Sequence, residues 1–241
     1  MMLSRNRFRK QLYPSYQDYE TSRAPVDEYY GDTRLYSIYD QQPESTEQNH
    51  TDQDGIVDPE CLIKHPLQFQ WTLWYQEPDK NKSWGDNLNE VTTVGTVEDF
   101  WSLYNHIKSP SDLKTGCDYS LFKQGIRPMW EDEKNFRGGR WVINVPRQQR
   151  HELDKYWLDT ILCLIGEAFD NPEEICGAVV NVRQKMDKIA IWTSTVMNRD
   201  AMYSIGRIFK ERIGLKLPIV YHVHKDTMGK SGSSIKALYT I

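Results

Sequence analysis

Residues 128–141, PMWEDEKNFRGGRW, are the most informative stretch of this sequence. Trp130 and Glu131 come first, a polar run follows, and a Gly-Gly pair precedes Arg140 and Trp141. One loop therefore carries an aromatic face, a carboxylate and a cation. These groups suit a flat, cationic ligand that donates hydrogen bonds and carries anionic groups. The plainer alternative is a solvated acidic turn between two strands, with one half-buried Trp.

The segments around this loop predict strands in hairpin order. Residues 67–75 alternate, with Leu67, Phe69, Trp71 and Leu73 on one side. Further strands are predicted at 119–122, 141–145, 178–183, 188–193 and 218–221. The strands 178–183 and 188–193 form a hairpin around residues 185–187. Because alternate side chains share a face, this hairpin places Arg183 and Lys188 together beside its turn.

Three helices interrupt the strands. The first begins after Thr96 as N-cap, with apolar residues three and four positions apart as far as Ile107. The second spans 147–165 and is followed by Gly166, and the third runs from Asn198 to Gly214. Its inward residues are predicted to be Tyr203, Ile208 and Phe209. Together the pattern predicts an α+β fold, with three helices packed on one face of a mostly antiparallel sheet.

Composition separates an N-terminal tail from one domain. All eight Trp lie between Trp71 and Trp192, whereas residues 1–60 hold seven of the fourteen Tyr. This segment has twelve acidic and six basic residues, a net charge of −6, which leaves about +2 for the rest of a chain with net charge −4. We expect residues 1–60 to be a disordered, acidic, Tyr-rich tail and residues 61–241 to form the domain.

Several classes of protein are not indicated. The sequence has no apolar run long enough to span a membrane and no secretory leader pattern, so we expect no membrane partner and a cytoplasmic location, with the nucleus as a second compartment. The four Cys form no C-x-x-C pair, and catalytic motifs are absent, so we expect no metal, no cofactor and no enzyme activity. His222 and His224 alternate on one strand, where exposed or hydrogen-bonded histidines are a plainer explanation than metal ligands.

The aromatic and basic residues instead suit a methylated guanine nucleotide. Methylation at N7 makes guanine cationic, and stacking between two Trp detects that charge. The guanine edge has two adjacent N–H donors that match the carboxylate of Glu131. Phosphates need Arg and Lys, for which the candidates are Arg140, Arg183, Lys188 and Lys230.

Longer motifs resemble one known family. These include TVEDFW at 96–101, GCDYSLFK at 116–123, PMWEDEKN at 128–135, RGGRW at 137–141, CGAVVNVR at 176–183 and DKIAIWT at 187–193. Together with HPL at 65–67, Trp84 and LCLIGE at 162–167, they resemble eukaryotic translation initiation factor 4E, the cap-binding family, in order over residues 65 to about 236. The resemblance implies a curved eight-stranded antiparallel sheet with three helices on its convex face and the mRNA cap on its concave face.

The resemblance also implies roles for individual residues. Trp84 and Trp130 are the stacking faces, Glu131 binds the guanine edge and Trp192 lies against the methyl group. Arg183 and Lys188 match positions that contact the phosphates directly, and Arg140 matches one that acts partly through water. Asn181 is a nearby polar residue. On the convex face, the family binds a helical motif of scaffold factor 4G and of the 4E-binding repressors through positions matched here by His65, Pro66, Val97, Trp101, Leu158, Asp159 and Gly166.

Two residues bear on this assignment of family roles. The family commonly has Glu where this chain has Asp159, and Ser233 lies in the KSGS context of the family's C-terminal phosphorylation site. The resemblance thus implies an initiation factor that binds the cap and recruits 4G. The alternative is a cap-binding repressor or specialised paralogue that binds the cap without productive scaffold binding.

Overall fold

The computed structural model describes residues 63–83, 85–227 and 235–241. Within them, eight strands form one antiparallel sheet in the order β2-β1-β3-β5-β6-β4-β7-β8. The eight-stranded antiparallel sheet that the family resemblance implied is confirmed, although the sequence pattern itself located only six of the strands. The strands are β1 (Pro66–Gln76), β2 (Leu88–Thr96), β3 (Asp118–Lys123), β4 (Gly139–Pro146), β5 (Ile175–Asn181), β6 (Met186–Thr193), β7 (Val220–Val223) and β8 (Tyr239–Thr240).

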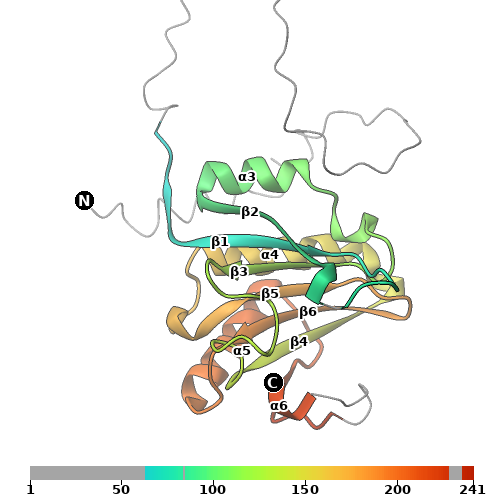
Figure 1. Ribbon diagram of the computed structural model, residues 1–241. Helices are drawn as coiled ribbons and strands as arrows, with labels where there is room; N and C mark the ends of the chain where they lie inside the picture. The colour runs from blue at the N-terminus through green and yellow to red at the C-terminus, as the bar shows by residue number, and fades with distance from the viewer. Residues whose placement is uncertain (1–62, 84, 228–234) are drawn as a thin grey trace, which may run out of the picture. The chain divides into compact units, whose positions relative to one another are not determined.

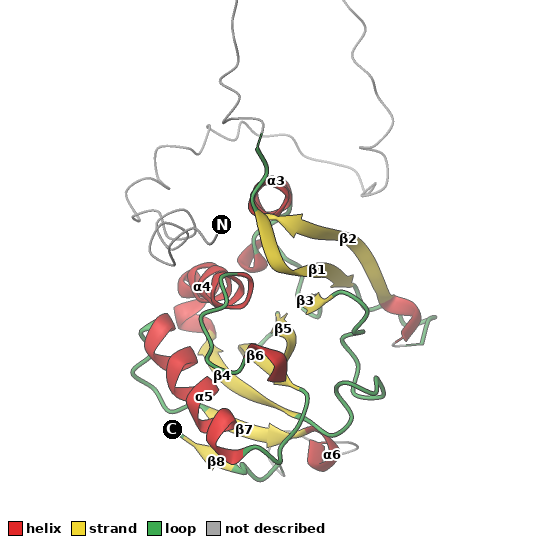
Figure 2. Ribbon diagram, turned by 90° about the vertical axis from the view of Figure 1, so that its left-hand side faces the viewer, coloured by secondary structure: helices red, strands yellow, loops and turns green. Residues whose placement is uncertain are grey.

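Three long helices, α3 (Val97–His106), α4 (Leu153–Ile165) and α5 (Arg199–Ile213), lie on one side of this sheet (Figures 1 and 2). The Thr96 side chain caps α3 by accepting from the Asp99 amide, as predicted. Trp141 on β4 donates its indole N–H to the Met202 carbonyl at 2.9 Å, which ties α5 to the sheet. Short helical segments are α6 (His224–Thr227), η2 (Gly85–Asn87), η3 (Pro110–Asp112), η4 (Arg147–Glu152) and η5 (Pro172–Glu174).

The two faces of the sheet have different cores. Large buried side chains such as Trp141, Ile143, Trp157 and Ile191 fill the space between sheet and helices. A smaller apolar cluster packs on the opposite face and consists of Phe122, Val142, Cys176, Val179, Ala190 and Trp192. The pairing of β1 with β2 is irregular at two points. The three long helices cover the convex face of the curved sheet (Figure 2), so the face opposite them is the concave one, and it is apolar where Trp192 lies.

Several boundaries differ from the sequence predictions. The helix predicted over 147–165 is a 3₁₀ segment, η4, with a kink at Gln149, followed by α4 from Leu153. The strand predicted over 178–183 starts earlier and ends at Asn181, and the last predicted strand lies at 220–223. In α5, Phe209 is buried as predicted, but Tyr203 and Ile208 are only partly buried. The strands β2 and β8 and helix α6 were not predicted.

Some predictions fall outside the described residues. These concern the tail at 1–60, Trp84, Lys230 and Ser233. Among the helices that the structure describes, none has the length and apolar character needed to cross a membrane.

Candidate functional site

The loop that carries Trp130 and Glu131 is held by two residues further along it. Asp132 accepts the amide hydrogens of Arg127 and Lys134 at 3.0 and 2.9 Å. The Asn135 side chain, which is fully buried, donates to the carbonyls of Arg127 and Met129 at 2.8 Å each. The chain just before Trp130 is thus fixed from within the loop. Trp130 itself keeps 37% of its surface exposed, which leaves ring surface available for a ligand.

The Gly-Gly pair explains how this loop joins the sheet. A Cβ at Gly138 would lie 1.7 Å from the Thr193 carbonyl oxygen, and one at Gly139 would lie 2.5 Å from the His222 carbonyl oxygen. Only glycine permits backbones to approach this closely. The close approach sets the path of the chain between the Trp130 loop and Arg140.

Strand pairing brings four of the predicted residues onto two neighbouring rows of the sheet. Arg140 on β4 lies opposite Trp192 on β6, with its guanidinium carbon 5.9 Å from the indole centroid. Lys188, also on β6, lies opposite Asn181 on β5. Since positions two residues apart share a face, Lys188 and Trp192 project on the same side of the sheet. That side is the concave face, where Trp192 belongs to the apolar cluster.

The cations on this face repel one another. Burial lowers the pKa of Lys188, and the positive charges of Arg140 and Arg183 lower it further. Burial also lowers the pKa of Arg140. An anion bound among these side chains relieves the repulsion, so the arrangement favours a polyanionic group over a neutral one.

Arg183 is held by a buried carboxylate. Its guanidinium donates to both oxygens of Asp118, with Nη2 2.9 Å from Oδ2, and Nη1 also donates to the Val182 carbonyl at 3.0 Å. Although burial by itself lowers the pKa of Arg183, the hydrogen bonds and charge of Asp118 raise it. This pairing fixes the direction of a long, flexible side chain next to Lys188.

Two histidines join the same face from β7 and α6. His222 lies opposite Arg140, and its pKa is lowered by burial and by the charges of Arg140 and Lys188. The His224 ring packs 4.1 Å from the Trp192 ring between centroids and is only 1% exposed. Burial, with the charge of Arg140, lowers its pKa to about 3. Neither His224 ring nitrogen has a hydrogen-bond partner among the described residues, so the expectation of an exposed or hydrogen-bonded pair is wrong for His224.

Known proteins of one family are similar to this chain in sequence and in fold. The family model described as eukaryotic initiation factor 4E matches residues 66–238. The chain belongs to the initiation factor 4E family. Eukaryotic translation initiation factor 4E of Xenopus laevis is 55% identical over 203 residues, which cover 83% of this chain and 95% of that protein.

Solved structures of initiation factor 4E proteins share the fold. Ascaris suum eIF4E-3 in complex with an m2,2,7G cap is 50% identical, with a TM-score of 0.70 over 74% of this chain and 99% of that one. A schistosome eIF4E complexed with m7GpppA and 4E-BP is 36% identical, with a TM-score of 0.71 over 74% of this chain and 100% of that one.

On the opposite side of the sheet, contacts organise the predicted partner face around the start of β1 and α3. His65 donates its amide to Glu98 at 2.8 Å, and its Nδ1 lies 2.6 Å from the same carboxylate. Burial alone raises the pKa of Glu98, but the hydrogen bonds from His65 outweigh it and lower the pKa. The Val97 amide donates to the His65 carbonyl at 2.9 Å. The first turn of α3 is therefore joined to the start of β1.

The aromatic residues of α3 are graded in burial. Phe100 is 2% exposed, whereas Trp101 is partly exposed and contacts the rings of Phe100 and Tyr104. Tyr104 is also only partly buried, so Phe100 and Val97 fill the core position without it. On α4, Leu158 and Asp159 are partly exposed, and Lys155 donates to Asp159 at 3.3 Å. Gly166 caps the end of α4, as predicted.

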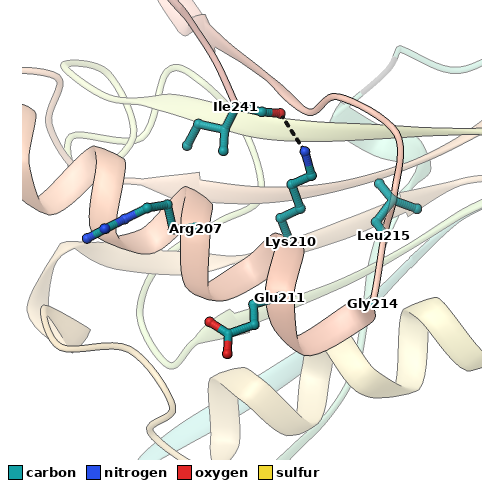
Figure 3. A pocket seen from close by; sticks show the side chains of 6 residues that line it. All are labelled: Arg207, Lys210, Glu211, Gly214, Leu215 and Ile241. Carbon is teal, nitrogen blue, oxygen red and sulfur yellow. Dashed lines mark hydrogen bonds between the residues drawn. The ribbon is translucent and has the colours of Figure 1, made fainter.

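A separate pocket of about 340 Å³ lies at the C-terminal end of α5 (Figure 3). Lys210 donates to the Ile241 carbonyl there at 3.1 Å, beside Arg207, Glu211, Gly214 and Leu215. None of the predicted cap or partner residues lines it. We assign it no part in the site.

Sequence reasoning missed the residues that support the site. Asp118 and Asn135 lie within motifs that were recognised, but no local pattern marks them as anchors. The position of His224 against Trp192 depends on the pairing of distant strands. The burial of Asn135 is likewise seen only in the structure.

Proposed function

We propose that this chain binds the 7-methylguanosine cap of mRNA and recruits scaffold factor 4G to start cap-dependent translation. One observation carries the proposal: Arg140, Lys188 and Trp192 lie together on the concave face, and the Trp130–Glu131 loop continues into that row through Gly138 and Gly139. The cap has the three chemistries that this arrangement suits: a cationic purine, two N–H donors on its edge and a triphosphate.

The relatives support the same function. The Ascaris suum and schistosome proteins are solved with cap ligands, and the schistosome protein also with 4E-BP. We propose that Trp84 and Trp130 stack on the base, Glu131 binds its edge, and Trp192 lies against the methyl group. Phosphate binding falls to Arg140, Arg183, Lys188 and Lys230, with Asn181 beside them.

The second surface of the proposal is the convex face. We assign partner binding to His65, Pro66, Val97, Trp101, Leu158, Asp159 and Gly166, with 4G and the 4E-binding repressors as partners and Ser233 as a phosphorylation site. Membership of an initiation factor family supports a binding role and no catalytic one. The repressor alternative is not favoured, because the relatives matched over most of their length are initiation factors.

Capture on an immobilised cap tests this function. Full-length chain in a cell extract is expected to be retained on 7-methylguanosine triphosphate resin together with 4G, and to elute with free methylated nucleotide and not with guanosine triphosphate. Elution by both nucleotides alike would contradict cap recognition. Retention without 4G would contradict the recruiting role.

We also propose a cytoplasmic location, where capped messages are translated. Imaging of the tagged full-length chain tests this, and its exclusion from the cytoplasm would contradict it.

A further inference from the structure

A buried carboxylate, Asp187, lies next to two of the proposed phosphate-binding residues, on the helix side of the sheet. Asp187 directly precedes Lys188 on β6, so its side chain points away from the concave face, and it is 1% exposed. Its Oδ1 accepts the backbone N–H of Arg183 at 2.7 Å. One carboxylate thus contacts the backbone of one proposed phosphate ligand and is covalently adjacent to the other.

Asp187 is itself held from the helix side. Arg150 in η4 places its Nε 3.1 Å from Oδ2 of Asp187 and its Nη2 3.4 Å from Oδ1. Arg150 is only 21% exposed, so this ion pair is largely shielded from water. Arg147, in the same segment, donates to the Gln184 carbonyl at 3.1 Å. The turn after β5 and the start of β6 are therefore each fixed to η4 at one point.

We propose that Asp187, supported by Arg150, is a positioning residue that sets the spacing of Arg183 and Lys188 and thereby the preference for a triphosphate over a monophosphate. This inference rests on the proposed cap-binding function. Asp118 directs the Arg183 guanidinium, whereas Asp187 fixes the backbone from which that side chain extends. The two carboxylates thus constrain one proposed phosphate ligand at both its guanidinium and its backbone, and Asp187 is covalently joined to the other.

Simple electrostatics predicts the opposite effect of removing Asp187. Its negative charge lies close to the phosphate residues, and it contributes to the raised pKa of Arg183. On charge alone, Asp187→Ala makes the site more positive and strengthens triphosphate binding. If the carboxylate acts by position, the same variant loses triphosphate preference. The sign of the change therefore separates the two explanations.

The experiment measures the Kd of 7-methylguanosine monophosphate and triphosphate for the full-length chain by calorimetry. The triphosphate preference is the Kd of the monophosphate divided by the Kd of the triphosphate. We expect Asp187→Ala to lower this ratio by roughly three- to tenfold, and to do so by raising the Kd of the triphosphate alone, because a misplaced side chain loses much of its contribution to binding. The double variant Asp187→Ala with Arg150→Met restores the net charge and leaves no buried charge unpaired, so it folds even if the single variant does not. The double variant is expected to show the same loss of triphosphate preference. Arg212→Gln, a control at an exposed position, is expected to leave that preference unchanged.

A folded variant whose ratio is unchanged or increased would overturn the proposal. An equal rise in the Kd of the monophosphate and of the triphosphate would also overturn it. Failure of the proposed function has a different signature. In that case the wild-type chain itself shows no preference for methylated over unmethylated guanosine triphosphate, and the inference falls with it.

Discussion

At the scale of single residues, Glu131 offers a sharp test of base recognition. Glu131→Gln replaces two acceptor oxygens by one acceptor and one misplaced donor, so we expect 7-methylguanosine triphosphate affinity to fall by about 1–2 kcal/mol. The loss opposes simple electrostatics, because removing a negative charge favours an anionic ligand. Calorimetric titration measures it.

Glu133, exposed in the same loop, provides the matched control. Glu133→Gln makes the same change in charge and is expected to leave the affinity unchanged. Equal effects of the two variants would show that Glu131 does not contact the base edge.

His224 predicts a dependence of stability on pH. Burial, with Arg140, lowers its pKa from 6.5 to about 3, so between these values the unfolded chain binds a proton that the folded chain does not. The free energy of unfolding therefore falls as pH falls below 6.5, by up to about 1.4 kcal/mol per unit from this group. Denaturant unfolding at pH 6.5 and 5.5 measures the fall.

The control for this prediction is His224→Gln, which cannot titrate. It is expected to lose about 1 kcal/mol less than the wild type over the same interval. A variant as sensitive to acid as the wild type would show that other groups cause the loss.

At the scale of elements, the Trp130 loop depends on Asn135. Asn135→Ala leaves the Arg127 and Met129 carbonyls without their buried donor, which costs about 1–3 kcal/mol of stability. Because the loop then has to be ordered by the ligand, cap affinity is expected to drop by roughly tenfold. Chemical denaturation and cap titration measure the two effects, with exposed Asn105→Ala as control. Undiminished cap affinity would mean that the loop is not held in advance by Asn135.

Two adjacent residues of α3 are expected to have different roles: Trp101 binds partners, and Phe100 packs in the core. Trp101→Ala is expected to abolish binding of 4G and 4E-BP with little change in cap affinity and a much smaller fall in melting temperature than a core truncation, because a partly exposed Trp is a typical anchor for a helical partner. Phe100→Ala, at a buried position, is expected to cost about 3–5 kcal/mol of stability. If Trp101→Ala melts like Phe100→Ala, Trp101 is a core residue. If it folds and still binds 4G, the partner face lies elsewhere.

At the scale of the whole molecule, local sequence patterns predicted most helices and strands. They did not predict which strands pair in the sheet. Alternation located β1, and the capping pattern located α3 to within a residue. β2 was missed because its side chains are mostly half-buried or exposed, so it lacks the alternation of a strand with one buried face. Its place in the sheet comes from pairing with β1.

The candidate site shows the same division. The types of Trp130, Glu131, Arg140 and Lys188 could be matched to a ligand from the sequence, because their chemistry is local. The contacts of Asp118 with Arg183, and of Arg150 with Asp187, join segments far apart in the chain and have no local signature. Sequence therefore predicted candidate binding groups, and the structure adds the contacts that hold several of them in place.

The central claim is that two Trp faces detect the positive charge of a methylated guanine. Its most direct test is calorimetric titration of the full-length chain and of Trp130→Ala with 7-methylguanosine triphosphate and with guanosine triphosphate. Cation–π contributions of about 0.5–2 kcal/mol per face predict that the wild type prefers the methylated nucleotide by roughly five- to a thousandfold. Trp130→Ala is expected to lose much of that preference while remaining folded. Equal affinities in the wild type, or an undiminished preference in Trp130→Ala, would contradict it.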